Sequence, residues 1–102
     1  MELSLLYYFK TVAEQENITK AAELLYISQP ALSKAIAKLE KSLDVTLFER
    51  RKGRISLSAM GRVYYEYVSS AFQVLETGEK KLEEMKQTSA ETVSIASPVA
   101  GV

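Results

Sequence analysis

The stretch that decides the fold covers residues 19–61. It begins with TKAAELLYISQPALSKAIAKLE (residues 19–40), continues through LFER (residues 47–50) and the basic loop RKGR (residues 51–54), and ends with LSAMG (residues 57–61). Two short helical segments joined by a tight turn, the second with spaced lysines on a polar face, are typical of a unit that fills the major groove of DNA. The stretch therefore predicts a helix-turn-helix followed by a basic hairpin.

The amino-acid composition argues against several classes of function. The chain has 102 residues, enough for one small domain with an extension, and contains no cysteine and no histidine. These absences remove disulfides, thiolate metal sites and the commonest general base. No apolar run approaches a membrane span, and the N-terminus lacks the basic start of a signal peptide. We expect a cytoplasmic, nucleoid-associated protein that is not an enzyme, with no catalytic residue, no metal, no cofactor and no membrane contact.

Charge is distributed unevenly along the chain. The 13 basic and 13 acidic residues cancel, which taken alone argues against a nucleic-acid binder. Residues 28–62, however, hold eight basic and three acidic side chains, whereas residues 63–102 hold three basic and six acidic ones. The regional imbalance predicts a basic surface on the helix-turn-helix and hairpin only.

Apolar periodicity predicts three helices before the hairpin. Residues 3–15 carry an apolar stripe at spacings of three and four, and a second helix is expected to be capped by Thr19. Ser28 fits the N-cap of a third helix, since Pro30 suits the first turn, and that helix should end near Leu43.

Two strands and a long helix are expected after residue 43. Residues 47–48 and 55–57 are the expected strands, with Gly53 supplying the positive φ of the turn. Ser58 should cap a fourth helix that begins near Ala59 and ends near Gln87, about 43 Å long at 1.5 Å per residue. Its apolar seam repeats in steps of four and three and needs a partner helix: Tyr64, Val68, Ala71, Leu75, Leu82 and Met85, with Gly78 between them.

The spacing of these motifs is similar to that of a known family. The pattern is Ala22-x-x-Leu25-x-x-Ser28-Gln-Pro-Ala-Leu-Ser33-x-x-Ile36-x-x-Leu39-Glu40-x-x-Leu43, then Leu47-Phe-x-Arg50 and Leu57-Ser-x-x-Gly61. Over residues 2–87 it resembles the N-terminal domain of LysR-type transcriptional regulators. The chain departs from the family at Asp44, where glycine is usual, at Ser58, where threonine is common, and at Gly53 and Arg54, which shift the wing arginine by one position.

The resemblance implies a mainly α fold: a winged helix-turn-helix of three helices and a two-stranded β wing, followed by a long dimerisation helix. We expect the DNA-binding domain in residues 1–58 and the linker helix in residues 59–87. Residues 88–102 would form a hinge and the start of a missing effector-binding domain, with a strand at residues 93–96. The implied partners are double-stranded DNA and a second copy of the chain, with a tetramer as the alternative for the full-length protein and a small effector bound only by the missing domain.

Site residues follow from the predicted recognition helix and hairpin. Gln29 is the first candidate for base reading, because its amide can pair with the N7 and N6 edge of adenine. Pro30 offers apolar surface to a thymine methyl, although it serves equally well as a helix-start residue, and Ser33 and Lys34 continue the same face. Contacts to the DNA backbone, or from the wing, are expected from Thr19, Ser28, Lys38, Lys41, Arg51, Lys52 and Arg54. Arg50 could instead tie the wing to the domain through Glu40.

The hypothesis is a sequence-specific domain that binds an interrupted inverted repeat in a promoter as a dimer. One rival is a coiled-coil protein-interaction module, which the zero net charge favours and the basic stretch opposes. Another is the winged helix of a molybdate-responsive regulator, which the unbroken run of residues 28–33 fits less well than the LysR type.

Overall fold

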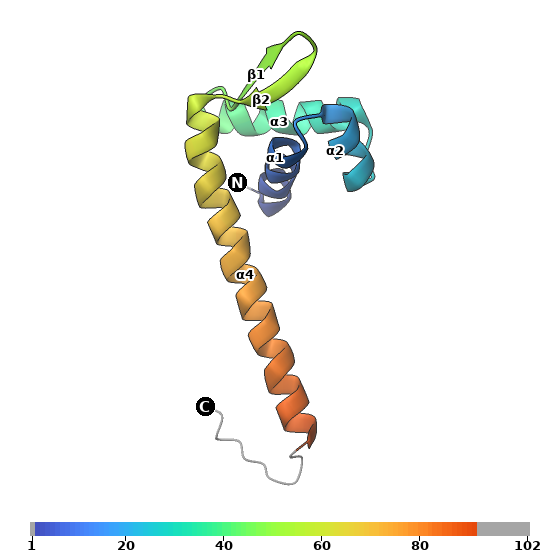
Figure 1. The fold of residues 1–102 in the computed structure, drawn as a ribbon, viewed down its shortest axis with the longest axis vertical. Coiled ribbons are helices and arrows are strands. Elements are labelled where there is room, and N and C mark those ends of the chain that lie inside the picture. The colour runs from blue at the N-terminus through green and yellow to red at the C-terminus, as the bar shows by residue number, and fades with distance from the viewer. Residues whose placement is uncertain (1, 92–102) are drawn as a thin grey trace. The chain divides into compact units, whose positions relative to one another are not determined.

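A computed structural model describes residues 2–91 (Figure 1), without the side chains of residues 89–91. The elements follow the order α1 (Leu3–Gln15), α2 (Ile18–Leu25), α3 (Gln29–Leu43), β1 (Phe48–Arg51), β2 (Arg54–Leu57) and α4 (Ala59–Glu91). The mainly helical fold with a two-stranded sheet confirms the predicted fold class. The strand expected at residues 93–96 lies outside the described residues. The chain divides after Ser69 into two units, which are described separately.

Helix ends in the first unit explain two features of the sequence. The Ser28 hydroxyl accepts a hydrogen bond from the amide of Ala31 (3.2 Å), which confirms Ser28 as the N-cap of α3. At the other end of α3, Asp44 has φ 58° in the left-handed region. Aspartate adopts this conformation more readily than most residues other than glycine. A carboxylate residue therefore occupies the position where glycine is usual.

The predicted cap of α2 was wrong. Asn17 is the N-cap, and its side-chain oxygen accepts from the amide of Lys20 (2.9 Å). Thr19 therefore lies inside the first turn of α2, and its hydroxyl has a different partner, described below. The physical reason is that Asn17 is itself a strong cap residue, and the chain leaves the left-handed Glu16 (φ 50°) directly into extended backbone at Asn17.

The hairpin is longer than predicted. Phe48 pairs with Leu57 and Arg51 with Arg54 in an antiparallel register, so each strand has four residues. The loop consists of Lys52 (φ 51°) and Gly53 (φ 77°). Two successive positive φ values define a type I′ turn, whose twist matches that of the flanking strands. Gly53 therefore has the role that the sequence predicted.

The core of the first unit joins α1, α3, the hairpin and the start of α4. Phe9, Val12, Leu32, Leu39 and Leu47 are fully buried. The Phe9 ring lies 5.5 Å from the rings of both Phe48 and Tyr64, measured between centroids. Phe9 of α1 therefore packs against both the wing and α4 and joins them to the helical core.

The junction between β2 and α4 accounts for the LSAMG motif. The amide of Gly61 donates to the Ser58 hydroxyl (2.9 Å), so Ser58 caps α4 as predicted. The amide of Ser58 donates to the carbonyl of Leu47 (2.9 Å). A Cβ at position 61 would overlap that same carbonyl oxygen, and glycine is therefore required there.

Helix α4 ends at Glu91, beyond the predicted end at Gln87. Its first residues belong to the first unit, which extends past the predicted boundary at residue 58. Val68 is only 4% exposed, and Tyr64 is half-buried against Phe9. Both were predicted in the dimer seam. Val68 instead packs into the core of its own chain, whereas the seam contact of the half-buried Tyr64 stays a prediction. Sequence spacing alone does not distinguish the two environments.

The second unit has no such core among its described side chains. From residue 70 to residue 88 every side chain is exposed except that of Phe72, which is half-buried. Leu75, Leu82 and Met85 are 47%, 62% and 51% exposed. Ala71 is exposed as well. In the part of the chain that the structure covers, no helix is long and apolar enough to cross a membrane.

Candidate nucleic-acid interface

Helix α3 has two distinct faces. Leu32, Ile36 and Leu39 are buried on one side. Three predicted base-contact residues lie away from this side within the first two turns: Pro30 and Lys34 are exposed and Ser33 is half-buried. Gln29 lies three residues before Leu32, at the edge of the buried stripe, and is exposed as the first residue of the helix. Lys38 and Lys41 are also exposed, further along the helix.

The start of α3 is tied to the start of α2. The side-chain Nε2 of Gln29 donates a hydrogen bond to the Thr19 hydroxyl, with 2.6 Å between the two atoms. Both side chains are exposed. Sequence reasoning predicted DNA contacts for each residue separately and missed their contact, because nothing in the spacing indicates which pair of helix-start residues will meet.

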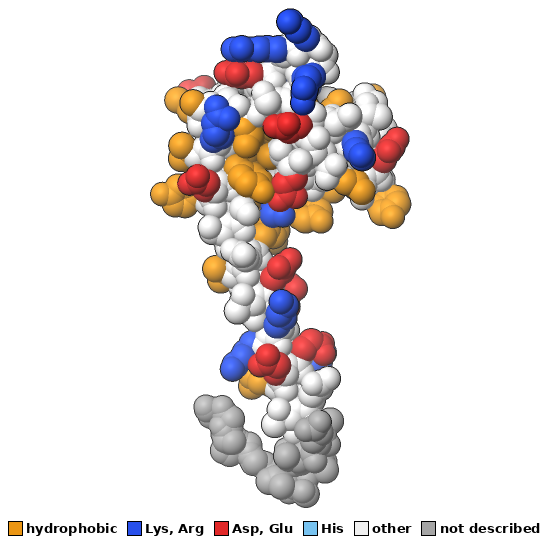
Figure 2. Space-filling model, viewed as in Figure 1, with side chains coloured by type: hydrophobic (Ala, Val, Ile, Leu, Met, Phe, Trp, Pro, Cys, Tyr) orange, Lys and Arg blue, Asp and Glu red, His pale blue; other side chains and the backbone are white. Residues whose placement is uncertain are grey.

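The hairpin carries the second basic cluster. Arg51, Lys52 and Arg54 are exposed, and Figure 2 shows basic side chains gathered over the hairpin that Figure 1 labels β1 and β2. Arg51 lies 3.8 Å from the Glu49 carboxylate and Arg54 lies 3.9 Å from that of Glu16. Long, exposed ion pairs of this kind contribute little energy, so both arginines can exchange their partner for a phosphate.

Arg50 does not tie the wing to the domain through Glu40. The Glu40 carboxylate accepts hydrogen bonds from the backbone amides of Leu47 (2.7 Å) and Phe48 (3.3 Å). Among the described residues it forms no ion pair with Arg50. Glu40 thus joins the middle of α3 directly to the backbone that leads into β1.

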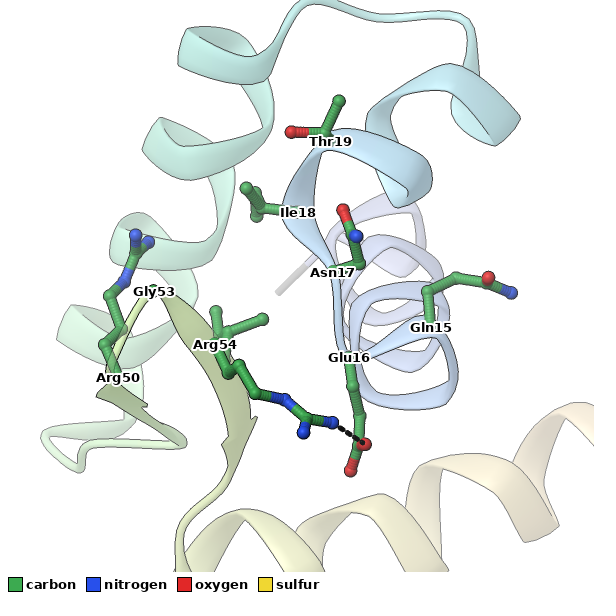
Figure 3. Close-up of a pocket in the computed structure, with 9 residues that line it drawn as sticks. Gln15, Glu16, Asn17, Ile18, Thr19, Arg50, Gly53 and Arg54 are labelled. Atoms are coloured by element: carbon green, nitrogen blue, oxygen red, sulfur yellow. Dashed lines mark ion pairs between the residues drawn. The ribbon is translucent and has the colours of Figure 1, made fainter.

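A shallow groove separates the hairpin from the turn between α1 and α2 (Figure 3). Figure 3 shows Arg54 extending across it to Glu16, while Arg50 points away from Glu16. The groove also connects the wing with Thr19. Its lining consists of Gln15, Glu16, Asn17, Ile18, Thr19, Arg50, Gly53, Arg54 and Ile55. The lining thus mixes polar and charged side chains with the apolar Ile18 and Ile55.

Groups with shifted pKa values lie elsewhere, on α1 and α4. Burial tends to raise the pKa of Glu14, but hydrogen bonds from Lys10 and Tyr65 outweigh it and leave the pKa lowered. Conversely, the hydrogen bond to Glu14 raises the pKa of Tyr65. This cluster connects two helices and has the character of a structural contact. Over residues 2–91, no group of three or more potential ligands is placed to hold a metal ion.

Tyr26 is a surface feature that the sequence did not single out. It lies between α2 and α3 with φ 58° and is 94% exposed. Its position next to the start of α3 adds it to the candidate interface.

Two helices joined by a tight turn, with a β-hairpin beside them, define the class: the first unit is a winged helix-turn-helix domain. The model of the lysR family of bacterial regulatory helix-turn-helix proteins matches residues 3–62. The chain belongs to the LysR family and is a DNA-binding domain of this type of transcriptional regulator. The match supports this family over the molybdate-responsive alternative.

Similar proteins support the assignment. A probable RuBisCO transcriptional regulator of Phaeodactylum tricornutum is 43% identical over 84 residues, which cover 82% of this chain and 27% of that protein. The regulator CitR of Bacillus subtilis is 34% identical over 96 residues, which cover 94% of this chain and 33% of that protein. The chain spans only about a quarter to a third of the length of these relatives.

Solved structures of similar domains include DNA complexes. The structure of BenM_DBD with catB site 1 DNA has 34% sequence identity and a TM-score of 0.70, and the match covers 88% of this chain and 96% of that one. The CbnR_DBD complex with DNA has 31% identity and a TM-score of 0.74, with 84% and 99% covered.

Proposed function

We propose that this domain reads a specific double-stranded DNA sequence with the first two turns of α3, while the hairpin and the lysines of α3 contact the phosphate backbone. The observation that carries the proposal is the polar face of α3, which starts at the exposed Gln29 and lies in the same unit as the exposed basic hairpin. It is supported by the DNA complexes of the similar domains BenM_DBD and CbnR_DBD.

Each contact class has its own chemistry. In this proposal Gln29 reads adenine through its amide, Pro30 contacts a thymine methyl, and Ser33 and Lys34 reach base edges or nearby phosphates. The remaining contacts neutralise or hydrogen-bond phosphates and carry little sequence information. They come from Thr19, Ser28, Lys38, Lys41, Arg51, Lys52 and Arg54.

We infer a dimer from the exposed apolar residues of α4. Ala71, Leu75, Leu82 and Met85 are spaced at four, seven and three residues, which is the pattern of one helix face. Helices of this kind bury their apolar face against a partner. A dimer would present two copies of α3, and its DNA site would then be an interrupted inverted repeat.

The relatives are about three times as long as this chain, which is consistent with a regulator that has a further domain. We propose that in such a protein a small effector binds that domain and controls transcription through this one. The domain itself is proposed to have no catalytic role and to need no cofactor.

The test is selection of bound duplexes from a random pool, followed by titrations of the selected site and a random duplex. Gln29→Ala should weaken the selected site by about 1–3 kcal/mol and leave random DNA almost unchanged. Lys38→Ala is the matched control on the same helix: both duplexes should weaken equally, and the salt dependence should fall by about one unit of slope. Equal losses on both duplexes for Gln29→Ala would refute base reading by this residue.

A second candidate function, beside DNA binding, is a protein-interaction module built on the exposed face of α4. The row of exposed apolar residues in the second unit favours it. Sedimentation of the purified domain separates it from homodimerisation, because such a module predicts a monomer until its partner is added.

A further inference from the structure

The side-chain amide of Gln29 does not rotate freely. Its Nε2 donates to the Thr19 hydroxyl at 2.6 Å, a short distance for this kind of hydrogen bond. Thr19 is branched at Cβ and lies in the first turn of α2, so its hydroxyl has few positions to adopt. A hydroxyl can also donate, but when the Thr19 hydrogen is donated to a phosphate its oxygen can only accept, and the contact then holds the amide in one of its two orientations.

Thr19 is available to hold the Gln29 amide, because the polar side chains near it cap helices instead. The Asn17 side chain accepts from the amide of Lys20, and the Ser28 hydroxyl accepts from that of Ala31. Both are thus used as helix caps. The contact between Thr19 and Gln29 is a bond between two helices, and it joins a residue of α2 to the first residue of α3.

The orientation decides which base the amide fits. Adenine presents an acceptor at N7 and a donor at N6 in the major groove, whereas guanine presents two acceptors at N7 and O6. The Gln29 amide has two hydrogens and one carbonyl oxygen. When Thr19 accepts one hydrogen, one donor and one acceptor remain, which is the set that adenine requires. Two donors for guanine are then no longer available.

We propose that Thr19 is a positioning residue that fixes the amide of Gln29 and thereby sets the preference of α3 for adenine over guanine. The proposal rests on the proposed function, because it requires that Gln29 reads a base. Thr19 keeps its own hydroxyl hydrogen in this arrangement. It can still donate to a phosphate, so the predicted backbone contact and the positioning role are compatible.

The test compares duplexes that carry adenine or guanine at the one position where Gln29→Ala alters the selected sequence. The wild-type domain should prefer adenine by about tenfold or more, the ratio that a bidentate pair supplies. Thr19→Val replaces the hydroxyl with a methyl group of similar size and should reduce that ratio by about fivefold or more. Thr19→Ser keeps the hydroxyl and should preserve the ratio. Thermal unfolding of the variants should be close to wild type, since Thr19 is exposed.

Three results would overturn the proposal, and they are distinguishable. If Thr19→Val weakens both duplexes by the same factor, Thr19 is a phosphate contact only. If Gln29→Ala leaves the selected sequence unchanged, Gln29 reads no base, while DNA binding by the domain still stands. If the wild-type domain binds no duplex in a salt-dependent manner, the proposed function fails and the positioning role fails with it.

Discussion

Val68 and Leu75 are one heptad apart on the same helix, yet one is 4% exposed and the other 47%. In the first unit, apolar side chains from helices and hairpin surround Phe9 and bury each other. In residues 70–88 the same residue types, at the same spacing, remain exposed. A heptad pattern therefore shows that apolar residues share one helix face. Whether that face is buried within the chain depends on which elements pack against it.

The two glycines of α4 repeat this contrast. Gly61 lies against the carbonyl of Leu47, whereas nothing lies within 4 Å of a Cβ added at Gly78. Contacts within the chain therefore require glycine at position 61. At position 78 they do not, and the missing side chain leaves room for a second helix to approach closely.

The largest expected effect comes from removing the central aromatic residue of the core. Phe9→Ala should lower the free energy of unfolding by about 3–5 kcal/mol, because a fully buried ring leaves a cavity. Phe72→Ala is the matched change in the second unit and should cost about 1 kcal/mol, since that ring is only half-buried. Urea unfolding at low protein concentration measures both. Similar losses for the two variants would contradict the contrast.

Charges in the exposed face of the second unit should disrupt association. Leu75→Glu combined with Leu82→Glu should raise the dimer dissociation constant by about 100-fold or more, because two carboxylates would be buried in an apolar interface. Sedimentation over a range of concentrations provides the measurement. Gln73→Glu is the control, since Gln73 is exposed and lies on the side of the helix opposite Leu75 and Leu82. A double variant that still sediments as a dimer would place the interface elsewhere.

Alanine substitutions of the two glycines should change the stability in opposite directions in the two units. Gly61→Ala should destabilise the domain by about 2 kcal/mol, because the new methyl group forces the Leu47 carbonyl to move. Gly78→Ala should stabilise the helix by roughly 0.5–1 kcal/mol. Thermal unfolding and circular dichroism provide the readout. A weaker dimer in Gly78→Ala would show that a partner helix passes close to this position.

The smallest expected effect concerns the contact between α1 and α4. The Tyr65 hydroxyl donates to the Glu14 carboxylate at 2.7 Å and helps to lower the pKa of Glu14. A lowered pKa stabilises the fold above the unfolded-state pKa of about 4, and this contribution is lost as the pH falls through the folded value.

Tyr65→Phe should therefore cost less than about 1 kcal/mol at pH 7, because the pair is partly exposed. The difference from wild type should shrink as the pH falls through the lowered pKa of Glu14. Urea unfolding at pH 7 and at successively lower pH values measures it. Tyr67→Phe is the control, since Tyr67 is 72% exposed and its hydroxyl should contribute nothing measurable. A loss that stays constant as the pH falls would mean that the hydroxyl acts independently of the Glu14 charge.

The sequence predicted most of the local features of this fold well, such as helix caps and the turn of the hairpin. Ser28, Ser58 and Gly53 each act within three residues of their own position, so their roles could be inferred from their type and spacing. The cap prediction for Thr19 failed because Asn17, a stronger cap residue, lies two residues earlier. The ranking of cap residues favoured Asn17.

Tertiary contacts were beyond the reach of pattern analysis. Tyr64 and Val68 continue the same apolar period as Leu75, so their burial in their own core could not be separated from a partner interface. The candidate site shows the same limit. Its residues on α3 could be named in advance, but the bond between Gln29 and Thr19 depends on how two helices are packed.

The grip of Glu40 on the amides of Leu47 and Phe48 has a mechanical consequence. Because the carboxylate belongs to α3 and the amides lead directly into β1, these hydrogen bonds restrain the wing relative to the helix. In the proposed complex a displacement of α3 in the groove would therefore carry the wing with it. Adjustment to DNA sites of different shape would then require bending of the duplex.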